Sequence, residues 1–142
     1  MSKSYIPESV RQRVAEAARY RCGYCQTRQD IVGYPLHVEH IIPEAADGSS
    51  AEDNLWLACL LCNNHKGSQT HAKDPIMQTE VPLFNPRTQV WTEHFAWTEN
   101  GMQIVGTTAI GRATIQALKL NIPVRIHARR HWVSAGWHPP RD

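Results

Sequence analysis

The first half of the chain changes between the hydrophobic spacing of a helix and that of a strand. Residues 7–22 carry apolar side chains at helical spacing behind a proline that suits a first turn, which predicts a helix. Residues 35–42 alternate apolar and polar positions, and residues 54–59 form a shorter apolar run, so both predict strands. The small and acidic residues 43–53 between them predict a loop. A further helix is expected to begin within residues 62–74.

The second half of the chain predicts a hairpin followed by two helices. Residues 90–106 contain two apolar runs around Asn100-Gly101, a dipeptide that is favoured in tight hairpin turns. Residues 107–121 place apolar side chains at helical spacing. Residues 123–136 begin with a proline and end with a glycine, which are typical helix boundaries. We expect these elements to pack on the first half of the chain.

Length and composition are those of a modest domain. The chain has 142 residues, of which 42% are hydrophobic and 20% are charged, enough for one small core. The prediction is a single domain over residues 1–142, with a central unit at about 20–70 and flanking elements at about 80–138. No run approaches the roughly 20 apolar residues of a membrane span, and the first ten residues lack the apolar core of a secretory signal. We therefore expect a cytoplasmic protein with no membrane contact; the sequence does not predict an oligomeric state.

Charge is distributed unevenly along the chain, although the net charge is only +2. Residues 29–65 contain six acids and no lysine or arginine, whereas residues 112–142 contain six bases and one acid. This asymmetry favours an anionic partner held by the basic end, while a solvated helix face is the plainer alternative. Arg125, Arg129 and Arg130 recur at helical spacing, so they could grip phosphates from one face or simply face solvent.

The four cysteines fall into two pairs of identical spacing. Cys22 and Cys25 lie in CGYC, and Cys59 and Cys62 lie in CLLC. Two intervening residues let one turn aim both sulfurs at one point, and two such turns complete the tetrahedral shell that zinc prefers. Disulfides are rare in the expected compartment, and a redox motif does not explain two pairs. The spacing therefore predicts a structural Zn2+ site of four thiolates, with no open position for substrate.

The segment closed by these cysteines places an acid beside a histidine in an otherwise apolar strand. The motif HVEHIIP, at residues 37–43, sets Glu39 and His40 ahead of Asn54 and of CNNHKG. Together with the two CxxC pairs, this order resembles the HNH endonucleases of the ββα-metal superfamily in their zinc-stapled form. The likeness covers about residues 22–67. It implies an α+β fold: a ββα-metal core with a four-cysteine zinc site, flanking helices, and a C-terminal hairpin plus helices.

The resemblance also implies a role for each matching residue. His40 corresponds to the general base that takes a proton from the attacking water. Asn54 corresponds to the residue whose side chain braces the loop presenting that base. Glu39 stands where the family usually has aspartate, and it would hold a catalytic divalent ion together with Asn63. Lys66 fits the lysine that faces the phosphate or the helix end.

Plainer roles stay open for several of these positions. Asn54 could be only a turn residue, and Asn63 could cap the helix that follows the second cysteine pair. His37 could line the site as a neighbour of the metal. His65 could be an exposed neighbour of the site or could touch the phosphate.

Phosphodiester hydrolysis suits this set of side chains. A neutral imidazole can take a proton from water near neutral pH, and oxygen ligands favour Mg2+ or Mn2+ over a second zinc as the catalytic ion. Neighbours on a regular strand point to opposite faces, so Glu39 and His40 reach one phosphate only if the strand twists or ends at His40. The predicted function is an endonuclease that cleaves DNA and, as the resemblance implies, leaves a 5′-phosphate, with RNA left open as a substrate. The alternative is a non-catalytic zinc module that binds nucleic acid.

Overall fold

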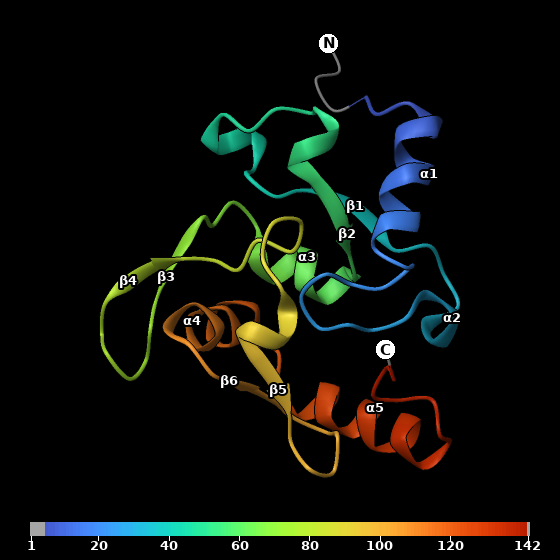
Figure 1. Cartoon of the computed structure of the whole chain (residues 1–142), viewed down its shortest axis with the longest axis vertical. Coiled ribbons are helices and arrows are strands. Elements are labelled where there is room, and N and C mark those ends of the chain that lie inside the picture. Colours follow the sequence, from blue (N-terminus) through green and yellow to red (C-terminus); the bar gives the residue numbers. More distant parts are fainter. Residues whose placement is uncertain (1–4, 142) are drawn as a thin grey trace. The chain divides into compact units, whose positions relative to one another are not determined.

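The computed structural model describes residues 5–141 and forms two compact units, which Figure 1 traces along the sequence. The first unit comprises the chain through Thr70 together with Asn85–Thr88. The second unit comprises His71–Phe84 and the chain from Gln89 onward. In the described part of the chain, every helix is too short or too polar to span a bilayer.

The first unit is a ββα arrangement preceded by a helix. α1 (Glu8–Ala17) leads into a segment that contains one short helix, α2 (Gln29–Val32). β1 (His37–His40) and β2 (Leu55–Ala58) then pair antiparallel, and α3 (Leu60–Lys66) follows β2 directly. The predicted first helix, both strands and the second helix are confirmed, and each is shorter than its sequence pattern.

A small apolar core joins α1 to the strand pair. Ile6, Val14 and Leu55 are almost fully buried, and Val10 and Val38 pack against them. Burying a side chain of this kind stabilises a fold by roughly 1.5–3 kcal/mol. This core covers only one face of β1 and β2, so the opposite face must be held by other means.

The loop between β1 and β2 contains two 3-10 turns, η1 (Glu44–Ala46) and η2 (Glu52–Asn54). It closes tightly at Gly48, whose amide donates to the Pro43 carbonyl at 2.9 Å. A Cβ atom at Gly48 would lie 1.6 Å from the Ile42 carbonyl oxygen, so only glycine fits this position. The loop predicted over residues 43–53 is therefore an ordered structure.

α3 begins two residues earlier than the sequence pattern indicates. Its N-cap is Cys59, whose sulfur accepts from the Cys62 amide at 3.5 Å. Its C-cap is Gly67, with φ 53° and ψ −129°, a backbone conformation that favours glycine. The second cysteine pair therefore also forms the start of α3.

The second unit contains the predicted hairpin and helices. β5 (Phe95–Trp97) and β6 (Ile104–Gly106) pair antiparallel around a turn that includes Gly101 at φ 74°. α4 (Ala109–Leu118) packs on β6, and α5 (Pro123–Ser134) starts at the proline expected at its first turn. The sequence pattern thus predicts both the type and the order of these elements.

A second hairpin in this unit has no counterpart among the predicted elements. β3 (His71–Lys73) and β4 (Glu80–Pro82) have three residues each, too few to show an alternating pattern. Asp74 holds the turn between them: its carboxylate accepts from the Ile76 and Met77 amides. The same carboxylate forms a two-pronged ion pair with Arg112 of α4, at 2.8 and 2.9 Å.

The Asp74–Arg112 pair makes the stability of the chain depend on pH. The guanidinium beside Asp74 holds the pKa of that buried carboxyl well below its usual range. The ionised pair therefore contributes its full stability above the ordinary aspartate pKa of about 4, and this contribution falls as the pH drops below that value. We expect Asp74→Asn to lower the urea midpoint at pH 7 and to differ less from the parent at pH 3.

The matched control for this substitution is Glu80→Gln, which neutralises an exposed acid on β4. It should leave the urea midpoint nearly unchanged at both pH values. A difference between Asp74→Asn and the parent that is constant with pH would contradict this role of the ion pair.

Candidate active site

The four cysteine sulfurs of the first unit converge on one point. All four side chains are buried, and their Sγ atoms lie within 4.8 Å of one another, with Cys25 and Cys59 at 3.6 Å. Zinc bonded to thiolates at about 2.3 Å requires sulfurs about 3.8 Å apart, so the cluster fits a zinc ion. No pair is joined as a disulfide. Burial raises the pKa of the Cys22 and Cys62 thiols, so a bound cation would have to displace protons from these sulfurs.

The first cysteine turn lies directly against β2. The Gly23 amide donates to the Leu57 carbonyl at 2.9 Å. A Cβ atom at Gly23 would come within 2.4 Å of Trp56 and 2.6 Å of Pro86, so the contact requires glycine. The second cysteine turn joins β2 to α3, and the cluster therefore ties together both ends of the segment that carries Glu39 and His40.

Glu39 points into a buried polar cluster on the side of the strand pair opposite the apolar core. Its carboxylate accepts a short hydrogen bond from the Tyr24 hydroxyl and lies 3.4 Å from the Lys66 ammonium. All three side chains are almost completely buried. Burial raises the pKa of the Glu39 carboxyl, whereas Lys66 and Tyr24 oppose that shift. A buried carboxylate is costly unless it is paired, and here Tyr24 and Lys66 are its partners.

Lys66 also fixes the backbone on which His40 stands. Its ammonium donates to the carbonyls of His40 and Ile41, at 3.1 and 2.9 Å. The ammonium thus reaches from the last turn of α3 to the end of β1, and it lies only 2% exposed. The family resemblance implies that Lys66 faces a phosphate or the helix end. In the structure its ammonium faces the end of β1 instead.

Asn54 holds the other side of the same strand end. Its amide oxygen accepts from the Ile42 amide, and its amide nitrogen donates to the carbonyls of Ile42 and Ser49, all at 2.8–2.9 Å. The Ile41 amide donates to the Asn54 carbonyl, so the main-chain pairing continues for one residue beyond β1. At Ile42, hydrogen bonds to the Asn54 side chain take the place of main-chain pairing. This is more than the contact of an ordinary turn residue.

His40 lies where β1 ends, partly exposed. Its Nε2 atom is 2.9 Å from the Ser50 hydroxyl, which comes from the loop that Asn54 braces. β1 ends at His40, although its side chain and that of Glu39 have no hydrogen-bond partner in common within residues 5–141. The Glu39 carboxylate meanwhile faces the buried cluster, whereas the His40 ring faces the loop.

The other predicted site residues of the first unit lie nearby on the same elements. Asn63 is partly exposed on α3, and it is not the helix cap, since Cys59 has that position. His65 is partly exposed in the last turn of α3. His37 is exposed at the start of β1, opposite Ala58.

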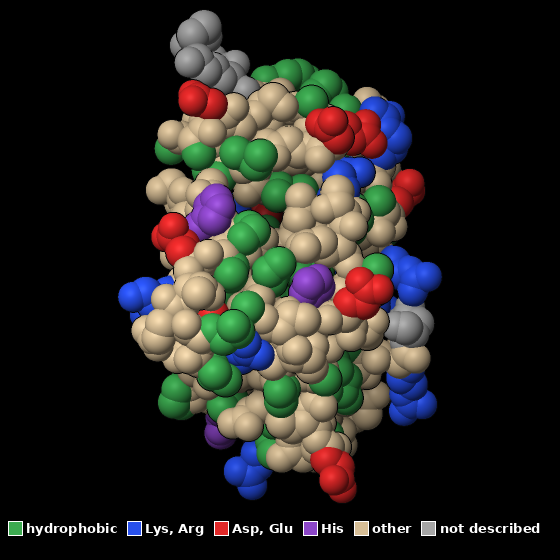
Figure 2. Space-filling view, turned by 60° about the vertical axis from the view of Figure 1, so that its left-hand side comes forward, with side chains coloured by type: hydrophobic (Ala, Val, Ile, Leu, Met, Phe, Trp, Pro, Cys, Tyr) green, Lys and Arg blue, Asp and Glu red, His purple; other side chains and the backbone are tan. Residues whose placement is uncertain are grey.

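The three arginines of α5 do not form the expected exposed row. Arg129 is 2% exposed, donates to the carbonyls of Leu120 and Met102, and lies over the Trp97 ring. Arg125 is also buried, and Arg130 is exposed. Arg125 and Arg129 are four residues apart, so they share one face of α5, and this face is buried. Figure 2 shows acidic and basic side chains interspersed on one face of the molecule, without a continuous basic patch.

Two contributors to the site lie outside the predicted set. Tyr24 stands between the cysteines of CGYC, where a residue would be taken for a spacer, and Ser50 lies in the small-residue loop. The sequence feature that could have indicated Tyr24 is its size: a large aromatic residue lies between two cysteines of a tight turn. In the structure this side chain is fully buried.

Comparison with known proteins finds a family that is similar to part of this unit. The family model for the HNH endonuclease matches residues 22–69. The strand pair, α3 and the cysteine cluster all fall in that segment, which is therefore similar to an HNH domain, in a chain of α+β structure. Proteins with this domain are generally nucleases that act on nucleic acids.

A curated relative is the Septu protein PtuB of Bacillus thuringiensis. It is 25% identical over 114 residues, which cover 79% of this chain and 41% of the relative. The chain therefore matches about two fifths of the length of that protein. No solved structure matches the chain significantly.

The cysteine cluster predicts a metal dependence of folding. Purified protein should contain one zinc ion per chain by atomic absorption, and Cys59→Ser should lose the ion and lower the melting temperature, because zinc binding contributes directly to folding. Adding a chelator to the parent should lower the melting temperature toward that of the variant. Parent protein that is free of zinc and insensitive to the chelator would contradict a structural zinc site.

The buried lysine predicts a large loss of stability on substitution. Lys66→Met should destabilise the first unit by about 3–5 kcal/mol in urea unfolding, because it leaves the Glu39 charge and two carbonyls without their buried partner. The matched control is Lys73→Met on β3, an exposed lysine whose removal should change the free energy of unfolding by less than about 0.5 kcal/mol. Equal effects of the two substitutions would show that the buried ion pair contributes nothing specific.

Proposed function

We propose that the first unit, which contains the HNH match, is a metal-dependent endonuclease that hydrolyses phosphodiester bonds in DNA. The observation that carries the proposal is the fixation of His40: Lys66 holds its carbonyl, Asn54 braces the following loop, and its ring stays partly exposed beside Ser50. A general base needs a fixed backbone and a side chain that is not fully enclosed.

His40 acts as the general base in this proposal. A neutral imidazole nitrogen can take a proton from water. The Ser50 hydroxyl, 2.9 Å from Nε2, orients the ring relative to the loop. The water that loses its proton to His40 then attacks the phosphorus, and the 3′ oxygen departs, which leaves a 5′-phosphate.

Glu39 and Asn63 are the residues proposed to hold the divalent ion. Both offer the hard oxygen donors that Mg2+ and Mn2+ prefer, from β1 and from α3, which pack together. An ionised carboxylate has about four acceptor positions, and the contacts of Glu39 with Tyr24 and Lys66 use two of them. When bound, such an ion supplies positive charge to the phosphate and to the departing oxygen. Lys66 and Tyr24 orient the Glu39 carboxylate.

A second candidate is a non-catalytic module that binds nucleic acid through exposed bases such as Arg130. The burial of Glu39 favours it, because a carboxylate tied to a lysine and a tyrosine can serve folding alone. The two candidates agree on the partner and differ in whether a phosphodiester bond breaks.

Cleavage of plasmid DNA separates the two candidates. With Mg2+ or Mn2+ the parent should nick or linearise supercoiled plasmid, and His40→Ala should lower the rate by about 10²–10⁴-fold, the usual contribution of a general base. Glu39→Gln and Asn63→Ala should also lower the rate, whereas binding of the plasmid should persist in all three variants.

The matched control is His71→Ala, which removes an exposed histidine of β3 in the second unit. It should cleave at the rate of the parent. Binding of DNA by the parent without cleavage under either ion would favour the non-catalytic module, and cleavage by His40→Ala at the parent rate would exclude His40 as the base.

A further inference from the structure

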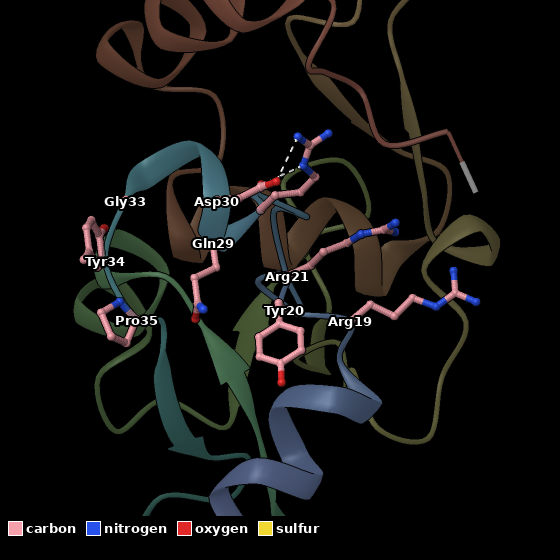
Figure 3. Close-up of a pocket in the computed structure, with 9 residues that line it drawn as sticks. Arg19, Tyr20, Arg21, Gln29, Asp30, Gly33, Tyr34 and Pro35 are labelled. Atoms are coloured by element: carbon pink, nitrogen blue, oxygen red, sulfur yellow. Dashed lines mark hydrogen bonds and ion pairs between the residues drawn. The ribbon is translucent and has the colours of Figure 1, made fainter.

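A cavity of about 580 Å³ opens in the first unit where α1 ends and the first cysteine turn begins. Figure 3 shows the residues that line it, with Tyr20 and Gln29 side by side and Tyr34 at one margin. Its volume is in the range of about 300–1,000 Å³ that small-molecule sites occupy. None of these lining residues belongs to the site around His40.

The cavity is built by an unusual turn of the backbone. Arg19 and Tyr20 are consecutive residues at positive φ, 57° and 56°, a conformation that is costly for side chains other than glycine. The turn lets the Tyr20 carbonyl accept from the Gln29 amide at 2.9 Å, and Arg21 then pairs antiparallel with Arg28. Two segments that are separated in sequence are thus held side by side, with arginines on both.

The lining combines positive charge with aromatic rings. Three arginines border the cavity, and the one acid, Asp30, is occupied by a two-pronged ion pair with Arg28 at 2.9 and 3.3 Å. Tyr20 and Tyr34 are 38% and 41% exposed, so their rings are accessible. The Tyr20 hydroxyl accepts from Gln12 of α1 at 2.9 Å, which holds that ring in place.

Guanidinium groups and exposed tyrosine rings that line one cavity match the chemistry of a nucleotide. Arginines attract phosphates, and an aromatic ring stacks on any base because every base has a flat face. A base inside a duplex is already stacked on its neighbours, so only an unpaired base can use the rings. The segment has no glycine-rich phosphate loop, which favours a nucleotide within a strand over a free nucleoside phosphate.

We propose that this arginine–tyrosine pocket, formed by Arg19, Tyr20, Arg21, Arg28, Gln29 and Tyr34, binds an unpaired nucleotide of the nucleic-acid strand. This inference rests on the proposed function, which supplies nucleic acid as the ligand. It adds a second point at which the protein contacts the nucleic acid, away from His40. Arg19 and Arg21 bind the strand's phosphates, and Tyr34 stacks on the base. The first unit would then prefer substrates that contain a single-stranded segment.

Fluorescence anisotropy with a labelled single-stranded oligonucleotide and a labelled duplex tests this site. All proteins carry His40→Ala to prevent cleavage and retain their zinc. The double substitution Arg19→Ala/Arg21→Ala should weaken single-strand binding at least tenfold. It should also reduce the slope of log affinity against log salt by about 1.4, since each single-strand phosphate contact contributes about 0.7.

The stacking contact has its own pair of variants. Tyr34→Ala should weaken single-strand binding about tenfold without changing the salt slope, and Tyr34→Phe should bind like the parent because the ring is kept. Arg13→Ala is the matched control for charge, since Arg13 is an exposed arginine of α1 that pairs with Glu52 at 2.8 Å and lies outside the pocket. It should retain the affinity of the parent for the single strand.

The outcomes separate this site from the proposed function. Failure of the parent to bind either oligonucleotide would overturn both. Binding by the parent with equal affinity in the Arg19/Arg21 and Arg13 variants would overturn the pocket alone. Equal losses of affinity for the duplex and the single strand would overturn the preference for an unpaired base. Displacement of the oligonucleotide by a mononucleotide at equal concentration would assign the pocket to a free nucleotide.

Discussion

The convergence of four buried cysteine sulfurs on one point is the constraint on which the first unit depends. Its apolar core is small, built around Ile6, Val14 and Leu55, and it covers only one face of the strand pair. A domain of this size often needs a metal ion or a disulfide to supplement its core. The cluster joins the turn after α1 to the junction of β2 and α3. It thereby closes a loop that contains β1 and the whole segment around His40.

Inside that closed loop, a buried charge pair sets the position of the strand end. Lys66 contacts the Glu39 carboxylate and also donates to two carbonyls at the end of β1, and Tyr24 donates to the same carboxylate from within the first cysteine turn. Each of these polar groups would be costly to bury alone, so they are stable only together. The zinc-type turn, the acid and the lysine therefore form one connected polar network. His40 sits on the backbone that this network holds.

Much of the first unit could be predicted from its sequence, because its signals are local. The CxxC spacing predicts the cluster, the alternation around Val38 predicts β1, and Asn100-Gly101 predicts the hairpin of the second unit. The matched HNH segment agrees with the motif that the sequence displays. These features depend on residues that are close in sequence or have strict geometric requirements.

The parts that could not be predicted depend on which side of an element faces inward. Lysine is seldom fully buried, so nothing in CNNHKG indicates that Lys66 points toward β1. The helical spacing of Arg125 and Arg129 shows that they share a face, but it does not show that this face is the inner one. β3 and β4 are too short to display a period, and the Asp74–Arg112 pair that supports them links residues 38 positions apart. Tertiary packing, rather than local pattern, decides each of these cases.

Amide hydrogen exchange with and without zinc tests most directly whether the cysteine cluster organises the site. We expect removal of the ion to accelerate exchange at Gly23, which bonds to β2, and at the Ile41 and Ile42 amides, which bond to Asn54, all together. The Ile104 amide of the second unit, bonded to Asn121, should keep its protection as an internal reference. Unchanged protection of Ile41 and Ile42 in zinc-free protein would show that the strand end beside His40 is held without the cluster.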